Sequence, residues 1–465
     1  MQRSKTKKSK RRKERTVIFP PMSKLPFHYG LQLRIYPSCE QMRIIHRNID
    51  AGRWYYNQLV AWGRLRLPKT KGNFPVFDAM RQRCDELMDT RIKEWKDTHP
   101  WLNNEDLDSC TFVLAHKAYQ AAWNLCKKVK SAGRPNFHKA ATHQSYQTSC
   151  HYNGKAILAA GEKPDLTNGS VRLLDGRHLL LPKLGSVRYK GSPKLLEKVR
   201  RMGMVRIGTV TIRILPTGEV WASLQLASDE PFAQPMPKTG KTVGIDLNLS
   251  NFLTDSDGNV IRNPRHYRRM MAHLKKFQRR QGKRLSRAKE RMGMKPTDHM
   301  SRKQLRELGN YQKASLDVRK AQQKVRRQRK DFLDKLSFQY IKNHDTVAAE
   351  ELRSRNLMKN HALSMSIADA GWRTLLDMLG RKAQMYGRTF VTVNPKNTTQ
   401  TCSACGHVMK GEGKIRLGVE EWTCPVCGTH HSRDWNAAKN ILARGLEKLG
   451  SAPPVPLWAP VLVEG

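Results

Sequence analysis

The stretch Cys424–Asn440, CPVCGTHHSRDWNAAKN, joins two features that are seldom adjacent in a protein chain. It begins with CPVCG, a CxxCG sequence typical of a metal-binding knuckle. A helix is expected to follow at once, opening with Arg433 and Asp434. An acid at a helix start is typical of an N-cap, but a carboxylate beside a metal knuckle also suggests a cation site. The rest of the chain bears on which interpretation of Asp434 holds.

The chain is strongly basic. Its 465 residues include 86 Lys and Arg against 39 Asp and Glu, a formal net charge of +47. Such a chain repels itself unless a polyanion neutralises it, and nucleic acid is the usual polyanion. A membrane surface is the weaker competitor, because no long apolar segment or amphipathic anchor stands out. The start, MQRSKTKKSKRRKER, has no apolar region after it, so we interpret it as a disordered basic arm and not an export signal.

Four of the nine cysteines fall in two CxxCG pairs with eighteen residues between them: Cys402, Cys405, Cys424 and Cys427. Two such knuckles supply the four thiolates of a tetrahedral, structural Zn²⁺ site. A redox dithiol is the alternative, but exchange chemistry does not require two pairs at this spacing. His407, His430 and His431 are possible substitute ligands, although four thiolates already close the site. The five remaining cysteines show no pairing pattern, which fits a reducing cytoplasm.

The chain from Lys241 onward has the pattern of an α/β fold. An apolar strand, KTVGIDLN (241–248), precedes two short strands joined by the turn DSDG, in which Asp255 and Asp257 are turn acids. A basic helical region follows over about 265–342, then the strand DTVAAEEL, one helix over SIADAGWRTLLDMLGRKAQMYGR, and the strand TFVTVN. Strands that alternate with helices predict a mixed sheet.

Three acids lie in comparable settings in this half. Asp246 is inside the apolar strand, Glu350 ends the strand TVAAE, and Asp434 opens the final helix. Each alone has an ordinary explanation: a structural acid, a strand-end ion pair and an N-cap, respectively. Together, carboxylates that converge at one sheet edge form an oxygen cage suited to Mg²⁺. Two such ions about 3.5–4 Å apart promote phosphodiester hydrolysis, and no P-loop or serine–histidine arrangement indicates other chemistry.

The N-terminal half reads as one unit of strands with inserted helices. FHYGLQLRIYP predicts a strand over Phe27–Tyr36, and helical periodicity follows from Glu40 to about Lys130. Residues 131–191 have short alternating runs, and VRIGTVTIRILPTGEVWASLQLAS predicts a β-hairpin with PTGE at its turn. We therefore expect a β-barrel interrupted by a helical lobe, joined to the second half by a proline-rich linker, 228–241.

The basic helical region contains RHYRRMMAHLKKFQRRQGKRLSRAKERMG and KAQQKVRRQRKDFLDKL. A solvated helix face is the ordinary explanation of charged helices. Here the charges are too one-sided for i,i+4 pairs to balance them. We therefore predict contact with phosphates, which positions nucleic acid without reading its sequence.

At these motifs the chain resembles the TnpB proteins of bacterial insertion sequences, RNA-guided nucleases related to compact type V CRISPR effectors. The likeness covers nearly the whole chain after the basic arm. It rests on LRIYPSCEQMRIIHRNIDAGRWYYNQLV, GRHLLLPKLGSVRYKG, GIDLN, EEL with NLMKN, SIADAGW, and CSACG with WTCPVCGTHHSRDWNAAKNI. The last motif is highly specific. One departure is Ser432, where the family commonly has aspartate.

The resemblance implies a RuvC-like, RNase H-fold nuclease with an inserted zinc ribbon, plus an N-terminal wedge β-barrel interrupted by a helical recognition lobe. Asp246, Glu350 and Asp434 match the catalytic, Mg²⁺-binding acids, and Arg433 precedes the last acid as in the family. Glu350 is preferred to Glu351 because the family places its glutamate directly before an acidic residue and leucine. The implied segments are a basic disordered arm (1–25), the first wedge strand (26–38), the recognition lobe (39–130), the rest of the wedge barrel (131–227), the linker (228–241), the nuclease core with its basic helices (242–397), the zinc ribbon (398–431), the final nuclease helix (432–450) and a proline-rich tail (451–465).

The function implied is RNA-guided cleavage of double-stranded DNA next to a short flanking motif. Base pairing with a guide RNA would then choose the sequence, and the protein would supply phosphate-binding charge. We expect one guide RNA on a monomer, no membrane partner, and action in the bacterial cytoplasm at the nucleoid. Two alternatives stay open: a compact type V CRISPR nuclease, and a non-cleaving repressor or transposition accessory protein.

Overall fold

The computed structural model describes residues 15–18, 20–66, 88–129, 131–151, 155–158, 169–202, 205–352, 361–416 and 418–450. The chain forms two compact units, which divide between Phe232 and Ala233. This division falls inside the segment predicted as the linker. Residues 1–14 of the predicted arm, the tail 451–465 and the NLMKN motif lie outside the described residues.

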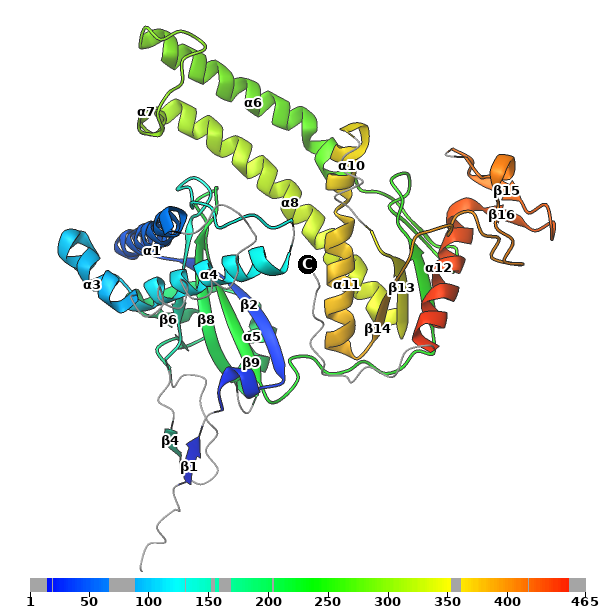
Figure 1. The fold of residues 1–465 in the computed structure, drawn as a ribbon, viewed down its shortest axis with the longest axis horizontal. Coiled ribbons are helices and arrows are strands. Elements are labelled where there is room, and N and C mark those ends of the chain that lie inside the picture. Colours follow the sequence, from blue (N-terminus) through cyan, green and yellow to red (C-terminus); the bar gives the residue numbers. More distant parts are fainter. Residues whose placement is uncertain are drawn as a thin grey trace, which may run out of the picture. The chain divides into compact units, whose positions relative to one another are not determined.

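The first unit is built on one antiparallel sheet of seven strands (Figure 1). Their order is β3-β8-β9-β2-β7-β6-β5, and neighbouring strands pair antiparallel throughout. The strands are β2 (Phe27–Tyr36), β3 (Ser145–Ser149), β5 (Arg172–Leu173), β6 (His178–Leu181), β7 (Gly185–Lys190), β8 (Val205–Ile214) and β9 (Val220–Ser228).

The two ends of this strand order approach each other. The Ser170 amide, just before β5, donates a 2.9 Å hydrogen bond to the carbonyl of His151, just after β3. The sheet therefore curls, as a barrel requires, but β3 and β5 do not pair along their described residues. The predicted strand at 27–36 and the PTGE hairpin turn are confirmed, whereas the closed barrel stays a prediction.

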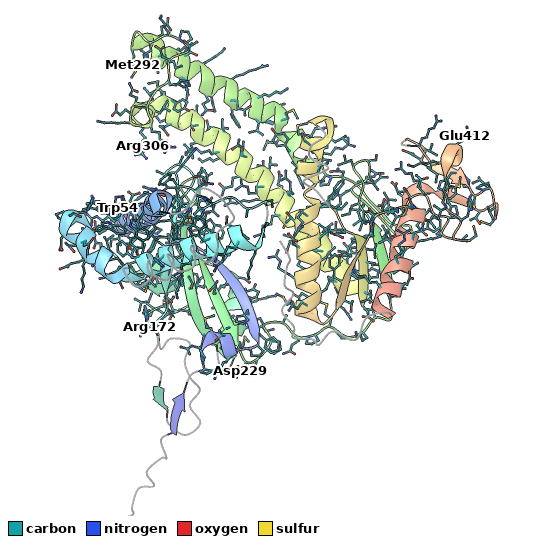
Figure 2. All side chains as sticks on the ribbon, in the orientation of Figure 1. Trp54, Arg172, Asp229, Met292, Arg306 and Glu412 are labelled. Carbon is teal, nitrogen blue, oxygen red and sulfur yellow. The ribbon has the colours of Figure 1, made fainter. Side chains whose placement is uncertain are left out.

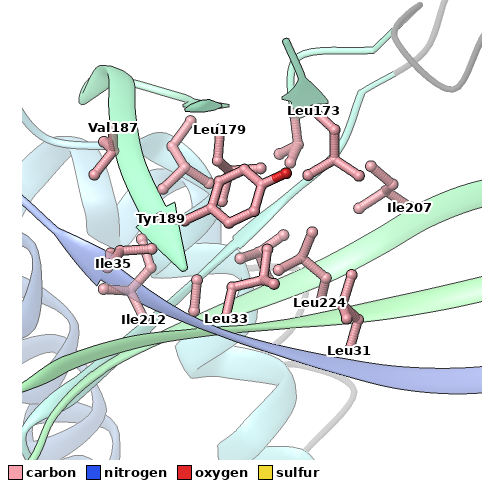
Figure 3. Close-up of a cluster of buried hydrophobic side chains, with 14 of the residues drawn as sticks. Leu31, Leu33, Ile35, Leu173, Leu179, Val187, Tyr189, Ile207, Ile212 and Leu224 are labelled. Carbon is pink, nitrogen blue, oxygen red and sulfur yellow. The ribbon is translucent and has the colours of Figure 1, made fainter. Parts of the chain in front are cut away.

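Alternation along the strands builds the core of the first unit. In β2, Leu31, Leu33 and Ile35 are buried while the residues between them are more exposed. Figure 3 shows these side chains directed at those of the neighbouring strands, including Val187 and Leu224. The hydrophobic face of the sheet is therefore set by the period-two pattern that also predicts its strands.

Helices complete the first unit. A second, aromatic-rich core lies among α1 (Cys39–Arg66), α3 (Met88–Thr98), the 3₁₀ turn η2 (Pro100–Asn103) and α4 (Ser109–Lys128). Asp108 caps α4 by accepting from the Cys110 amide at 2.9 Å. The helix α5 (Pro193–Arg201) was not expected from the β-rich pattern of this region; proline at its first turn starts it, and Leu196 and Val199 bury it in the sheet core.

Residues 15–18 differ from the predicted disordered arm. They form β1 (Arg15–Ile18), which pairs antiparallel with β4 (Lys155–Leu158). A 3₁₀ turn, η1 (Met22–Lys24), follows, and Leu25 is buried. The physical reason is that β4 pairs with the backbone N–H and C=O groups of this short segment. The run of charged residues before it gives no sign of that pairing in the sequence.

The second unit contains a mixed five-stranded sheet in the order β12-β11-β10-β13-β14. The central strand β10 pairs antiparallel with β11 and parallel with β13, which in turn pairs parallel with β14. A mixed sheet is thus confirmed. The strands are β10 (Thr242–Asp246), β11 (Leu253–Asp255), β12 (Val260–Ile261), β13 (Thr346–Glu350) and β14 (Thr389–Val393).

The two faces of this sheet are covered by different helices. Val243 and Ile245 of β10 pack with residues of α8 (Gly309–Asn343) and α11 (Trp372–Tyr386). Ala348 of β13 packs on the opposite face against Ile441 of α12 (Arg433–Gly450). Figure 1 shows α11 and α12 on the two sides of the strands.

The single helix expected over 366–388 is instead two helices, α10 (His361–Ala370) and α11. Gly371 separates them in the left-handed conformation, with φ of 70°. That conformation favours glycine and interrupts the helical hydrogen bonds. The apolar periodicity continues through the break, which is why the sequence pattern alone suggested one helix.

The basic region forms a helical hairpin of α6 (His266–Arg291), the short α7 (Arg302–Glu307) and α8. Leu274, Val318 and Ala321 hold α6 and α8 together. Figure 2 labels Met292 and Arg306 at the end of the hairpin that points away from the sheet of this unit. Of the 26 residues of α6, eleven are Lys or Arg and one is acidic, so its exposed surface is almost wholly cationic. No helix in the described part of the chain is long and apolar enough to span a membrane.

Candidate active site and metal cluster

Two of the predicted acids lie level with each other at one edge of the second sheet. Strands β10 and β13 pair in parallel register up to Ile245 and Ala349, so Asp246 and Glu350 are the next residue of each strand. Side chains alternate between faces along a strand, which puts both acids on the face of Ala348, the face that α12 covers. Glu351, the neighbour of Glu350, is exposed.

The third acid reaches this edge because α12 packs directly on the sheet. A Cβ added at Gly244 would lie 2.2 Å from the Ala438 carbonyl oxygen of α12. A Cβ added at Gly445 of α12 would lie 2.6 Å from the side chain of Ala348. Each glycine therefore permits a close approach of helix and strand, and the first turn of α12 brings Asp434 to the strand ends.

These three carboxylates interact electrostatically. Burial first, and then the charges of Glu350 and Asp434, raise the pKa of Asp246 to about 8, although Arg433 opposes the shift. Burial also raises the pKa of Glu350 and that of Asp434. Asp246 is only 7% exposed. Ionising all three acids together is therefore unfavourable in the protein alone, and a divalent cation bound between them would relieve that cost.

Polar neighbours fix two of the acids. Asn248 Nδ2 donates to Asp434 Oδ2 at 3.0 Å, and the Thr398 hydroxyl donates to Glu350 Oε1. Sequence reasoning missed both residues. Asn248 had a local signal, since it follows Asp246 by two residues in the predicted strand KTVGIDLN, but Thr398 had none.

Arg433 is the cation of this group. Its charge lowers the pKa of both Asp246 and Asp434, so its guanidinium lies near the carboxylates. Its Nε is buried and has no hydrogen-bond partner among the described residues. This N–H donor is therefore unsatisfied within the described part of the chain.

The three acids are not gathered as closely as the ligands of a single metal ion. In the described part of the chain, one set of three or more His, Cys, Asp or Glu ligand atoms lies wholly within 4.8 Å, and it is the cysteine set. The three carboxylates are therefore not assembled as a closed cation cage in this structure.

The raised pKa of Asp246 gives a stability prediction for the magnesium-free protein. From about pH 4 to pH 8 the folded state retains a proton that the unfolded state has released, so the free energy of unfolding falls as pH rises through this window. Asp246→Asn removes the cost of ionising this buried carboxyl. At about 1.4 kcal/mol per pKa unit, we expect the substitution to stabilise the protein by a few kcal/mol at pH 9. At pH 4 we expect little effect, because Asp246 is then protonated in the folded state. Thermal unfolding at both pH values measures this, with the exposed Glu351→Gln as control; an equal gain at both pH values would contradict the assignment.

Gly244→Ala is expected to separate α12 from the sheet. The added methyl meets backbone atoms, the Ala438 oxygen at 2.2 Å and the Leu442 nitrogen at 2.7 Å, which cannot rotate away. We expect a loss of about 1–3 kcal/mol in the free energy of unfolding. The matched control is Gly282→Ala in α6, where an added Cβ meets nothing within 4 Å and a gain of about 0.5–1 kcal/mol is expected. Chemical denaturation distinguishes the two, and equal effects would contradict the close approach.

The four predicted cysteines form one cluster in the second unit. Their sulfur atoms all lie within 4.8 Å of one another, with 3.7 Å between Cys402 and Cys427 and 3.7 Å between Cys405 and Cys424. Tetrahedral zinc with Zn–S bonds of about 2.3 Å separates its sulfur ligands by about 3.8 Å. The cluster therefore fits a four-thiolate zinc site.

The glycine after each CxxC closes the knuckle. The Gly406 amide donates to the Cys402 carbonyl at 2.9 Å, and the Gly428 amide donates to the Cys424 carbonyl at 3.0 Å. Both glycines have positive φ, 76° and 69°. Of the three candidate substitute histidines, His431 lies near the cluster with its Nε2 3.0 Å from Cys402 Sγ. It is placed to hydrogen-bond a thiolate that the cysteines already provide.

Two asparagines connect the cluster to α12. Asn436 Nδ2 donates to the Thr401 carbonyl at 2.7 Å, and its Oδ1 accepts from the Ser403 amide at 2.8 Å. Asn440, one turn later, donates to the carbonyls of Thr398 and Thr401. The spacing of four residues puts both on one helix face, so the helix that carries Asp434 is tied to the loop that carries Cys402. The sequence DWNAAKN shows this spacing, but not its partners.

The DSDG sequence forms the predicted turn, and Asp255 is its structural acid. Asp255 Oδ1 accepts from the amides of Asp257 and Asn259 at 3.0 and 2.8 Å, which closes the turn between β11 and β12. Asp255 Oδ2 accepts from the Tyr340 hydroxyl at 2.9 Å. These bonds use the carboxylate fully within the fold.

The fold and site define a basic α/β protein with acids at a sheet edge and a four-cysteine module. Two family models match the chain: "Probable transposase" over residues 223–361 and "Cas12f1-like, TNB domain" over residues 372–441. A Streptomyces pristinaespiralis protein, named as an RNA-guided DNA endonuclease, is 38% identical over 420 residues, which cover 90% of this chain and 89% of that protein. The chain belongs to the TnpB family of insertion-sequence proteins.

More distant relatives are also similar over most of their length. A Mycobacterium tuberculosis (strain ATCC 25618 / H37Rv) protein, also named as an RNA-guided DNA endonuclease, is 26% identical over 430 residues. The match covers 87% of this chain and 84% of that protein. Among solved structures, the mini-RNA-guided endonuclease CRISPR-Cas phi3 is 10% identical with a TM-score of 0.42, covering 90% of this chain and 92% of that one. The structural likeness is too slight to add to the family assignment.

Proposed function

We propose that this protein is an RNA-guided DNA endonuclease that hydrolyses phosphodiester bonds of double-stranded DNA with Mg²⁺ at Asp246, Glu350 and Asp434. The observation that carries the proposal is the buried, mutually repelling set of carboxylates in a chain of formal charge +47. A surface built to hold phosphate has no evident use for buried negative charge unless a cation joins it. Membership of a family whose relatives are named for this activity supports it.

The nuclease core is proposed to be a RuvC-like RNase H fold. Its five strands have the order third-second-first-fourth-fifth in chain sequence, with the first strand central and carrying Asp246 at its end. The fourth strand carries Glu350, and the helix on the sheet face carries Asp434. This arrangement supports three acids at one edge as a single hydrolytic centre.

Magnesium would be held by these three carboxylates and would supply charge for an activated water and for the leaving oxygen. The protein's own residues then position the substrate. Asn248 and Thr398 orient Asp434 and Glu350 through their hydrogen bonds. Arg433, with its Nε unpartnered, is placed to hold a phosphate oxygen beside them.

The zinc site is proposed to be structural. Four thiolates leave no open position for water, which catalytic zinc requires. Its effect on cleavage would pass through Asn436 and Asn440 to the start of α12. The cluster thereby stabilises the position of Asp434.

Guide RNA and target DNA are the proposed partners. The α6–α8 hairpin would contact phosphates. The wedge barrel and recognition lobe of the first unit would hold the heteroduplex and read the flanking motif. The one-sided charge of α6 supports the first assignment, since it has eleven basic residues and one acid. A monomer with one RNA, acting in the bacterial cytoplasm, completes the proposal.

The test is a cleavage assay on the expressed ribonucleoprotein. Sequencing the RNA that co-purifies identifies the guide, and a duplex that matches it is then incubated with and without Mg²⁺. We expect both strands to be cut only with Mg²⁺ and only in a matched target. Intact DNA under these conditions would remove the nuclease function and favour a non-cleaving, nucleic-acid-binding role. An RNA transcribed from a repeat array, and not from the element's end, would favour the CRISPR alternative.

A further inference from the structure

A cavity of about 210 Å³ in the second unit has no role in the site described above. Its lining includes Leu249 and Ser250 from the loop after β10, Arg265 and Arg268 at the start of α6, and Leu363 and Met365 of α10. Asn248, which donates to Asp434, directly precedes this lining. The cavity therefore adjoins the loop that contacts the proposed catalytic acids.

The charge of the cavity is positive. Its one carboxylate, Asp369, is already neutralised, because it accepts from the Tyr267 amide at 3.0 Å and pairs with Arg329 at 2.9 Å. Arg265 and Arg268 are exposed and form no ion pair with an acid among the described residues. An anionic group is therefore the complementary ligand.

The backbone holds Arg265 in an unusual conformation. Its φ of 48° lies in the left-handed region, which side chains other than glycine seldom adopt. Its amide donates to Asn263 Oδ1 at 3.0 Å, and Asn263 Nδ2 donates to the Leu249 carbonyl at 3.3 Å. Such conformations persist where surrounding contacts impose them and are common at ligand sites. These bonds fix the start of α6 to the loop after β10.

Part of the cavity lining is apolar. Leu363 is 43% exposed and Met365 is 42% exposed, unusual values for large apolar side chains that line one cavity. The volume is below the range of about 300–1,000 Å³ of pockets for drug-sized ligands, so it suits one planar group. Apolar contact beside unpaired guanidinium groups is the chemistry that holds a base together with its phosphate.

We propose that this cavity binds one unstacked nucleotide of the DNA strand that is cut, with its phosphate at Arg265 and Arg268 and its base against Leu363 and Met365. The inference rests on the proposed function and adds a subsite to it. A nucleotide held beside Leu249 would position the neighbouring phosphate at the acids, because Asn248 joins the two places.

The experiment pairs changes in the protein with changes in the substrate. Targets with a single abasic position, scanned through the nucleotides around the cut, are cleaved by wild type and by the variant Leu363→Ser/Met365→Ser in single-turnover reactions. We expect one or two abasic positions to slow wild type by about 5- to 30-fold, in line with the contribution of single base contacts. The variant should be slowed to a similar degree on intact DNA and show no further loss at those positions.

The arginines are tested separately. Arg265→Ala/Arg268→Ala is expected to slow cleavage by about tenfold while target binding in a mobility-shift assay stays within twofold, since guide pairing supplies most of that binding. Leu446→Ser, 41% exposed on α12, and Arg381→Ala, exposed on α11, are the matched controls and should cleave as wild type.

The outcomes separate the inference from the function on which it rests. The subsite would be overturned if no abasic position slowed cleavage by wild type. It would also be overturned if the abasic positions slowed the Leu363→Ser/Met365→Ser variant as much as they slow wild type. In both cases cleavage of intact DNA would still support the nuclease. Failure of wild type to cut intact matched DNA would overturn the proposed function and the subsite together.

Discussion

Asp246→Ala is expected to abolish DNA cleavage and to leave RNA binding near that of wild type. The carboxylate is 7% exposed and lies on the face of the sheet covered by α12, so it does not form part of the exposed cationic surface that would hold RNA. Its proposed role is to hold metal ions, which contribute several kcal/mol to such reactions. We therefore expect a loss of roughly a thousandfold or more in single-turnover cleavage, at about 1.4 kcal/mol per factor of ten.

The measurement compares cleavage with the yield of co-purified RNA. Glu351→Ala is the matched control, because it removes an exposed carboxylate one residue beyond Glu350, and it should cleave as wild type. Loss of RNA in the Asp246→Ala protein would indicate a structural role for the acid. Retained cleavage would remove Asp246 from the metal site, and Glu350→Ala and Asp434→Ala would then be expected to be active as well.

Cys424→Ser is expected to release the bound zinc and to destabilise the four-cysteine module. Cys424 is 1% exposed, and its sulfur lies 3.7 Å from that of Cys405. Structural zinc contributes about 10–16 kcal/mol of binding free energy in isolated modules, and one lost thiolate should lower zinc affinity by a hundredfold or more. Cleavage should fall with it, since Asn436 and Asn440 bond the cysteine loop to the helix that carries Asp434.

Elemental analysis and thermal unfolding test this expectation. Wild type should bind one zinc per chain, and Cys39→Ser, which replaces an exposed cysteine outside the cluster, should bind the same amount. If Cys424→Ser retains zinc, then another side chain has replaced the thiolate, and His431 is the first candidate because its Nε2 lies 3.0 Å from Cys402 Sγ. In that event the double variant with His431→Ala should lose the metal.

Much of the site followed from short sequence patterns. The two CxxCG pairs predicted the cysteine cluster because knuckle geometry depends on neighbouring residues, and the structure closes each with the amide of its glycine. Alternation predicted β2 over Phe27–Tyr36, and apolar strands that end in acids predicted that Asp246 and Glu350 share an edge. The roles of the three acids came from family resemblance and stay a proposal.

Other features depend on residues far apart in the chain. The break at Gly371 and the helix α5 were missed, since apolar spacing continues through the first and a β-rich pattern surrounds the second. The pairing of β1 with β4 joins segments about 140 residues apart, and no local signal in a charge run predicts a distant partner strand.

The sequence by itself determined the cationic character of the protein, its metal-type cysteines and the strands that end in acids. These depend on composition and on spacings of two to four residues, which fix local geometry. Only the tertiary structure decided that Gly244 lets α12 lie on β10, that Asn248 contacts Asp434 across 186 positions, and that Asp246 becomes buried among like charges. Burial and long-range approach arise when the whole chain packs, and they alone shift the pKa of Asp246.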